Sequence, residues 1–202
     1  MNTIIYWVGL TIILLLAIYI IFYFLYLKLK LEVDPAISTE SMPALKPVPI
    51  PTKNQKSVVH KLTVFIFEVR TWELVENWHY TLSDGVELVI PKGFRFDGAS
   101  IPRPFWAILN PIGLLLIPGL LHDYGYKYNQ IWQMTPDGEV IPYKKGDGKE
   151  YWDNLFKRVG KEVNGFFLVN FIAWLAVALG GSGSWNGHRK ENLEAVKPDL
   201  SR

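Results

Sequence analysis

The chain changes from a strand pattern to a helix pattern within Pro91-Lys92-Gly93-Phe94-Arg95-Phe96-Asp97-Gly98-Ala99-Ser100-Ile101-Pro102-Arg103. Before this segment, β-branched and aromatic runs predict strands over 62–69, 78–82 and 86–90, with a hairpin turn at 83–85. After it, apolar residues at helical spacing predict helices over 114–128 and 149–163. We therefore predict an α+β domain: a small antiparallel β-meander followed by about three packed helices.

The third helix is predicted over 166–179, an apolar run that ends in Gly180-Gly181 and is short for a membrane span. We interpret it as a core helix; the alternative is a second transmembrane segment. Pro118 is expected to kink or interrupt the helix over 114–128. Turn residues predict a loop over 130–148, with a short hairpin at 139–143.

The N-terminal segment predicts a retained membrane anchor. The run from Ile4 to Tyr26 contains no charge, Asn, Gln or Pro. At about 1.5 Å per residue it covers the roughly 30 Å hydrocarbon core of a bilayer. A cleaved signal peptide would have a basic start and a shorter apolar run. The run therefore predicts a single-pass protein that contacts the lipid bilayer through this segment. Lys28 and Lys30 flank its C-terminal end and favour a soluble domain in the cytoplasm.

Shifts in composition predict four parts: an anchor and its flank at 1–32, a proline-rich linker at 33–57, the α+β domain at 58–187, and a charged, solvated tail at 188–202. The formal net charge of +2 is spread over both signs without a basic stripe. Nucleic acid is therefore not an expected partner. The chain has no cysteine, which excludes disulfides and thiolate metal sites.

Five polar residues stand among residues that favour burial: Asp97, Ser100, His122, Asp123 and Asp153. Burying such groups without partners costs roughly 1–3 kcal/mol each, so they must be bonded, paired or metal-bound. On a helix, Asp123 lies about 100° round from His122. If the helices over 114–128 and 149–163 pack together, Asp153 can meet His122, and Asp97 can approach from the loop after the strands.

Three interpretations of these residues stay open. In the first, His122, Asp97 and Asp153 hold a divalent metal such as Zn, Mn or Fe for hydrolysis, and one remaining carboxylate acts as general base; Asp123 is a further catalytic candidate. In the second, ranked lower, Ser100 is a nucleophile, His122 is its base and Asp153 or Asp97 orients the imidazole, although the G-x-S-x-G elbow is absent. In the third, Asp97 and Ser100 cap turns, and His122 and Asp153 form a buried pair that fixes the helix register.

Three motifs occur in a fixed order: the segment 90–103, His122-Asp123-Tyr124-Gly125-Tyr126, and Asp153-Asn154-Leu155-Phe156. Together they resemble a domain family of unknown function, common in tailed phages, prophages and bacterial genomes, with the pattern GFxTDxASxPR…HDxxY…ADxxF. The resemblance covers roughly residues 60–185. Phe96 stands where the family has Thr, and Trp152 where it has Ala.

The resemblance implies a phage- or prophage-type protein without defining its activity. Two functions follow as hypotheses. One is a membrane-anchored, metal-dependent hydrolase that uses Asp97, His122, Asp123 and Asp153. The other is a non-enzymatic membrane protein with protein partners in virion assembly, superinfection control or an envelope complex.

Overall fold

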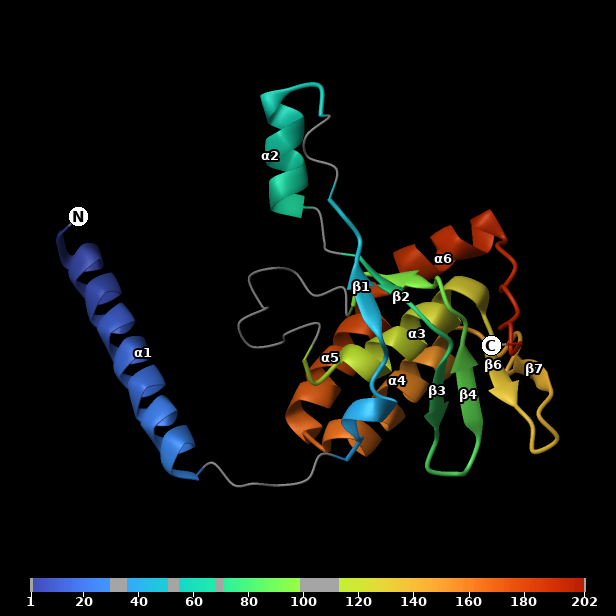
Figure 1. Cartoon of the computed structure of the whole chain (residues 1–202). Helices are drawn as coiled ribbons and strands as arrows, with labels where there is room; N and C mark the ends of the chain where they lie inside the picture. The colour runs from blue at the N-terminus through green and yellow to red at the C-terminus, as the bar shows by residue number, and fades with distance from the viewer. Residues whose placement is uncertain (1, 30–35, 51–54, 68–70, 99–112, 202) are drawn as a thin grey trace. The chain divides into compact units, whose positions relative to one another are not determined.

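The computed structural model describes residues 2–29, 36–50, 55–67, 71–98 and 113–201 (Figure 1). It divides into two compact units, Met1–Pro35 and Ala36–Arg202. The first unit contains one helix, α1 (Asn2–Leu29), whose apolar side chains are exposed along its length. The stretch Ile5–Lys28 is long and apolar enough to cross a membrane, a test that an N-terminal signal sequence also passes. The predicted apolar N-terminal helix is confirmed.

The second unit contains two small antiparallel sheets. One has the strand order β1-β2-β5 and the other β3-β4-β6-β7. The strands are β1 (Leu45–Pro47), β2 (Trp72–Leu74), β3 (Trp78–Thr81), β4 (Glu87–Ile90), β5 (Arg95–Phe96), β6 (Ile131–Met134) and β7 (Val140–Tyr143). The predicted turn joins β3 to β4, with Gly85 at a φ of +87° that favours glycine.

Among its described residues, the second unit has five α-helices: α2 (Val58–Phe67), α3 (Leu116–Tyr128), α4 (Lys149–Asn164), α5 (Phe167–Gly180) and α6 (Ser182–Glu191). α3 packs against α4 and α6, and α4 packs against α5 (Figure 1). α4 has the predicted amphipathic character, because it buries Trp152, Leu155, Phe156 and Val159. The α+β fold class is confirmed.

Of the predicted kink or interruption at Pro118, the interruption is wrong, since α3 is one continuous helix. Pro118 is the third residue of α3, in the first turn. Backbone N–H groups there have no partner within the helix, so a proline can occupy the position without losing a hydrogen bond.

The predicted strand over 62–69 is also wrong, because Val58–Phe67 forms helix α2. Ser57 Oγ accepts a hydrogen bond from the backbone N–H of His60, and Thr63 Oγ1 donates to the carbonyl of His60. Val58 and Leu62 are exposed. A β-branched run forms a strand when a neighbouring strand pairs with it; here local hydrogen bonds determine the conformation instead.

Two segments predicted as a loop, with a short hairpin at 139–143, and as a linker contribute strands. The stretch 130–148 supplies β6 and β7, where the register pairs Val89 of β4 with Trp132 of β6. The stretch 33–57 supplies β1, which pairs with β2. In both places the open edge of an existing strand provides backbone partners that the local composition does not reveal.

The C-terminal third also differs from the prediction. α5 buries only Asn170 and Ala173, so it is not enclosed as a core helix; its other apolar side chains are half-buried or exposed. α5 and α6 together pass the membrane-span test as a pair bent by 55°. The tail is largely exposed, but it is held against the domain, because the carbonyl oxygen of Val196 accepts a hydrogen bond from Trp132 Nε1 and that of Asp199 accepts one from Asn77.

Candidate functional site

Helices α3 and α4 approach each other closely at Gly125. A Cβ atom at this position would overlap the indole ring of Trp152. Glycine therefore permits the large aromatic side chain of α4 to lie directly on α3. This packing brings His122 of α3 against Asp153 of α4, as the sequence predicted for packed helices.

His122 is buried between two carboxyl groups. Its Nε2 lies 2.9 Å from Asp153 Oδ1, and its Nδ1 lies 3.8 Å from Asp123 Oδ1. The rings of Tyr126 and Phe156 enclose the imidazole, with centroids 4.0 and 5.5 Å away. Burial by itself lowers the pKa of His122, but the two carboxyl groups outweigh it, and the pKa lies above its ordinary value.

Both carboxylate oxygens of Asp153 have partners. Tyr126 donates its hydroxyl hydrogen to Oδ1 over 2.6 Å, and Lys149 donates to Oδ2 over 2.7 Å. Burial by itself raises the pKa of Asp153, but the hydrogen bonds from His122, Lys149 and Tyr126 outweigh it and hold the pKa below its usual range. Asp153 is therefore a buried, fully bonded carboxylate.

Lys149 extends this network to a third helix. Its Nζ also donates to the carbonyl oxygens of Val177 and Ala178 in α5, over 3.3 and 2.8 Å. Sequence reasoning gave no role to Lys149 or to the hydroxyl of Tyr126. Spacing could have indicated both, because Lys149 lies one helical turn from Asp153 and Tyr126 one turn from His122.

Asp123 has a different environment on the other side of the imidazole. Its side chain is 23 % exposed, yet its Oδ2 atom is buried without a hydrogen-bond partner among the described residues. Burial raises the pKa of Asp123 to about 6, and the nearby negative charge of Asp97 acts in the same direction. Asp123 therefore changes its protonation state close to neutral pH.

Asp123 and Asp97 line one cavity of about 390 Å³ between α3, β5 and α6. Asp97 follows β5 directly. Aromatic and basic side chains form much of the remaining wall: Phe94, Phe96, Tyr126, Arg95 and Lys127. A volume of this size accommodates a small substrate or one group of a larger one. The structure thus brings Asp97 to the same cavity as Asp123.

The predicted metal ligands were His122, Asp97 and Asp153. In the described part of the chain, no group of three or more His, Asp or Glu residues is arranged to hold a metal ion. Both ring nitrogens of His122 face carboxyl groups. The metal assignment stays a prediction. Ser100, the predicted nucleophile, lies outside the described residues.

Comparison with known proteins places the chain in a family. Residues 72–177, just over half of the chain, match the model described as "Protein of unknown function (DUF1353)". The chain belongs to this family, which confirms the expectation of a domain of unknown function.

A curated relative is "Uncharacterized protein y4jT" from Sinorhizobium fredii (strain NBRC 101917 / NGR234), 38% identical over 55 residues. The match covers 26% of this chain and only 16% of that relative. No solved structure matches the chain significantly.

Proposed function

We propose that this DUF1353 member is a membrane-tethered hydrolase in which Asp123 activates water. One observation carries the proposal: Asp123 lines a cavity together with Asp97 and keeps one carboxylate oxygen without a hydrogen-bond partner in the described structure. A native fold rarely leaves a buried polar atom unpaired, and such atoms are frequent where a ligand or a reacting group binds.

The proposed reaction uses Asp123 as general base. Asp123 takes a proton from water while the water oxygen attacks the electrophilic centre of the substrate; the bond to the leaving group breaks, and the proton passes to that group. A base with a pKa of about 6 is ionised at neutral pH and still basic enough for this step. Asp97 keeps that pKa raised, since two neighbouring carboxylates disfavour each other's charge.

His122 and Asp153 have positioning roles in this proposal. Asp153 holds His122 from the side away from Asp123, with an Nε2–Oδ1 distance of 2.9 Å. The imidazole in turn restricts the orientation of the Asp123 carboxyl group, whose Oδ1 lies 3.8 Å from Nδ1 of His122.

The proposed cellular location is inferred from the apolar helix α1 and from the lysines that follow it. Lys28 and Lys30 follow the apolar run and favour a cytoplasmic domain. A cytoplasmic domain cannot reach peptidoglycan, so the substrate is expected inside the cell. A phage or prophage association rests on the motif resemblance alone.

The test uses the full chain in detergent micelles and a panel of chromogenic carboxylic esters, phosphoesters, glycosides and peptides. We expect hydrolysis of one substrate class, with a rate that rises as the pH passes about 6. Asp123→Asn should lower this rate by about 100-fold or more while circular dichroism remains that of the wild type.

The matched control is Asp137→Asn, the same change at an exposed turn residue. It should keep the wild-type rate. The proposal fails if the folded wild type hydrolyses nothing on the panel, or if Asp123→Asn is as active as the wild type.

A further inference from the structure

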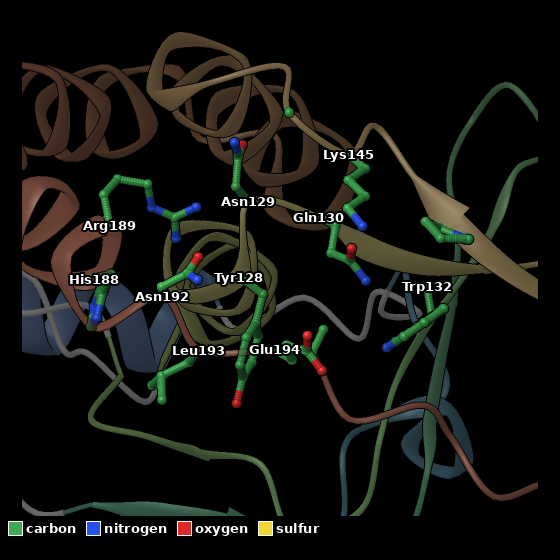
Figure 2. A pocket seen from close by; sticks show the side chains of 13 residues that line it. Tyr128, Asn129, Gln130, Trp132, Lys145, His188, Arg189, Asn192, Leu193 and Glu194 are labelled. Atoms are coloured by element: carbon green, nitrogen blue, oxygen red, sulfur yellow. The ribbon is translucent and has the colours of Figure 1, made fainter.

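A second cavity, of about 490 Å³, lies where the end of α3, β6, the end of α6 and the C-terminal tail meet (Figure 2). Asn129, Trp132, Lys145 and Glu194 are among its lining residues. The tail is fastened beside it, because the carbonyl oxygen of Val196 accepts a hydrogen bond of 2.8 Å from Trp132 Nε1. The volume is in the range of small-molecule sites.

Gln130 is the residue in this cavity that most needs an explanation. It is only 6 % exposed, yet its side-chain amide makes no hydrogen bond within the described part of the chain. Figure 2 shows this amide at the cavity together with the side chains of Lys145 and Glu194. The amide atoms of Gln130 are not among the fully enclosed unpaired atoms of the described residues, so they are open to the cavity, where a ligand can complete their hydrogen bonding.

Arg189 offers a second unused donor in the same cavity. Its Nη2 donates to the carbonyl oxygens of Tyr126 and Lys127 over 2.8 and 2.6 Å, and the guanidinium lies 4.6 Å from the ring centroid of Trp185. These contacts fix the orientation of the group. Its Nε is buried and has no partner in the described structure. The N–H donor there is oriented before any ligand arrives.

The charges around the cavity favour an anion. Lys145 lines it as an exposed lysine. Arg189 adds a second positive charge, and His188 lies at the wall. Glu194 is the acidic residue among the described lining residues. The ring of Trp132 supplies an apolar surface beside these groups.

We propose that this cavity binds a small molecule through an oxyanion group, a phosphate or a carboxylate. The amide N–H of Gln130, the guanidinium of Arg189 and the ammonium of Lys145 attract and bond the oxyanion, and charge-assisted bonds of this kind are the strong ones. Glu194 accepts a hydrogen bond from a hydroxyl or amino group elsewhere on the ligand. This site is separate from the proposed hydrolytic carboxylates Asp123 and Asp97, and the proposal does not depend on them.

The test titrates the full chain in detergent micelles with inorganic phosphate and, separately, with acetate. Nuclear magnetic resonance follows the side-chain amide of Gln130 and the indole N–H of Trp132. We expect saturable shifts of both signals. A stronger response to phosphate identifies a phosphate site, and a stronger response to acetate identifies a carboxylate site.

Gln130→Met keeps the volume of the side chain and removes the amide. It should weaken binding by about tenfold or more, read at the Trp132 signal, because a hydrogen bond to a charged group is lost. It should leave the melting temperature equal to or above that of the wild type, since the amide has no partner in the unliganded fold. Gln133→Met, the same change on β6 outside the cavity, should bind both anions normally.

Two results would overturn the proposal. One is that neither anion shifts the Gln130 and Trp132 signals of the wild type at high millimolar concentration. The other is that Gln130→Met lowers the melting temperature by several degrees and binds as well as the wild type, which would make the amide a structural group.

Discussion

Asp153 and Asp123 flank the same imidazole ring, but their surroundings are opposite. Asp153 accepts hydrogen bonds from Tyr126 and Lys149 and lies 2.9 Å from His122. Asp123 lies 3.8 Å from the ring, and its Oδ2 has no hydrogen-bond partner in the described residues. The pKa of Asp153 is held below its usual range, whereas that of Asp123 is raised to about 6.

This difference separates two roles that the sequence could not distinguish. A carboxylate with every oxygen bonded stabilises the fold and resists protonation. A carboxyl group with an unpaired oxygen at a cavity contributes less to the fold and is available for acid–base chemistry. The comparison predicts that removing Asp153 damages stability, and that removing Asp123 does not.

The largest effect is expected for Asp153→Ala. The change leaves the buried His122 and the half-buried Lys149 without their carboxylate partner, which should lower the free energy of unfolding by about 3–5 kcal/mol. Urea unfolding at neutral pH measures this quantity. Asp147→Ala removes a more exposed carboxylate and should cost less than about 1 kcal/mol. Equal losses in the two variants would contradict the comparison.

Lys149→Met should have the next largest effect. It removes the bonds from Nζ to Asp153 and to the carbonyl oxygens of Val177 and Ala178, at a cost of about 1–3 kcal/mol. Because these bonds join α4 to α5, amide hydrogen exchange should accelerate in α5 more than in α3. Lys161→Met, at an exposed position of the same helix, should leave exchange in α5 unchanged.

Asp123→Asn should be stabilising at neutral pH. Folding raises the pKa of Asp123 from 3.8 to about 6, so the folded state binds more protons than the unfolded state between these pH values. The contribution of this group to stability therefore falls as the pH rises from about 4 to about 6.

Above that window the variant should exceed the wild type by about 1–3 kcal/mol in free energy of unfolding. Below about pH 4 the two proteins should be alike. Urea unfolding across the pH range checks both statements. A variant less stable than the wild type at pH 7 would show that Asp123, like Asp153, holds the fold together.

The smallest effect is expected for Asp97→Asn. Removing this negative charge should move the pKa of Asp123 below about 6, while burial still keeps it above 3.8. The carbon-13 chemical shift of the Asp123 carboxyl group reports the titration midpoint directly. Asp137→Asn should leave the midpoint in place; an identical midpoint in Asp97→Asn would mean that burial alone raises the pKa.

The sequence predicted those elements whose pattern is local and strong. The hairpin of β3 and β4 follows from alternating apolar residues around Gly85, and α4 follows from an amphipathic repeat. The helix α2 was predicted as a strand, because a β-branched run carries no information about whether a partner strand exists. β6 was not predicted, because its partner strand, β4, is distant in sequence and the local pattern does not reveal the pairing.

The candidate site also contains features that the sequence predicted and features that it did not. The spacing of His122, Asp123 and Tyr126 on one helix placed them near each other, and the meeting with Asp153 followed if two amphipathic helices packed together. The sequence did not indicate the role of Lys149, because its bonds to α5 depend on how three helices pack. It also could not show that the tail closes a second cavity around Gln130.

By itself, the sequence determined the residue types, the apolar N-terminal helix, the α+β class and the family to which the chain belongs. Only the tertiary structure decided which carboxyl group is bonded on every oxygen and which one faces a cavity. The physical reason is that helical periodicity and turn chemistry are local properties of the chain. Burial, hydrogen-bond satisfaction and the pKa of a carboxyl group are set by neighbours that the fold brings together from distant positions.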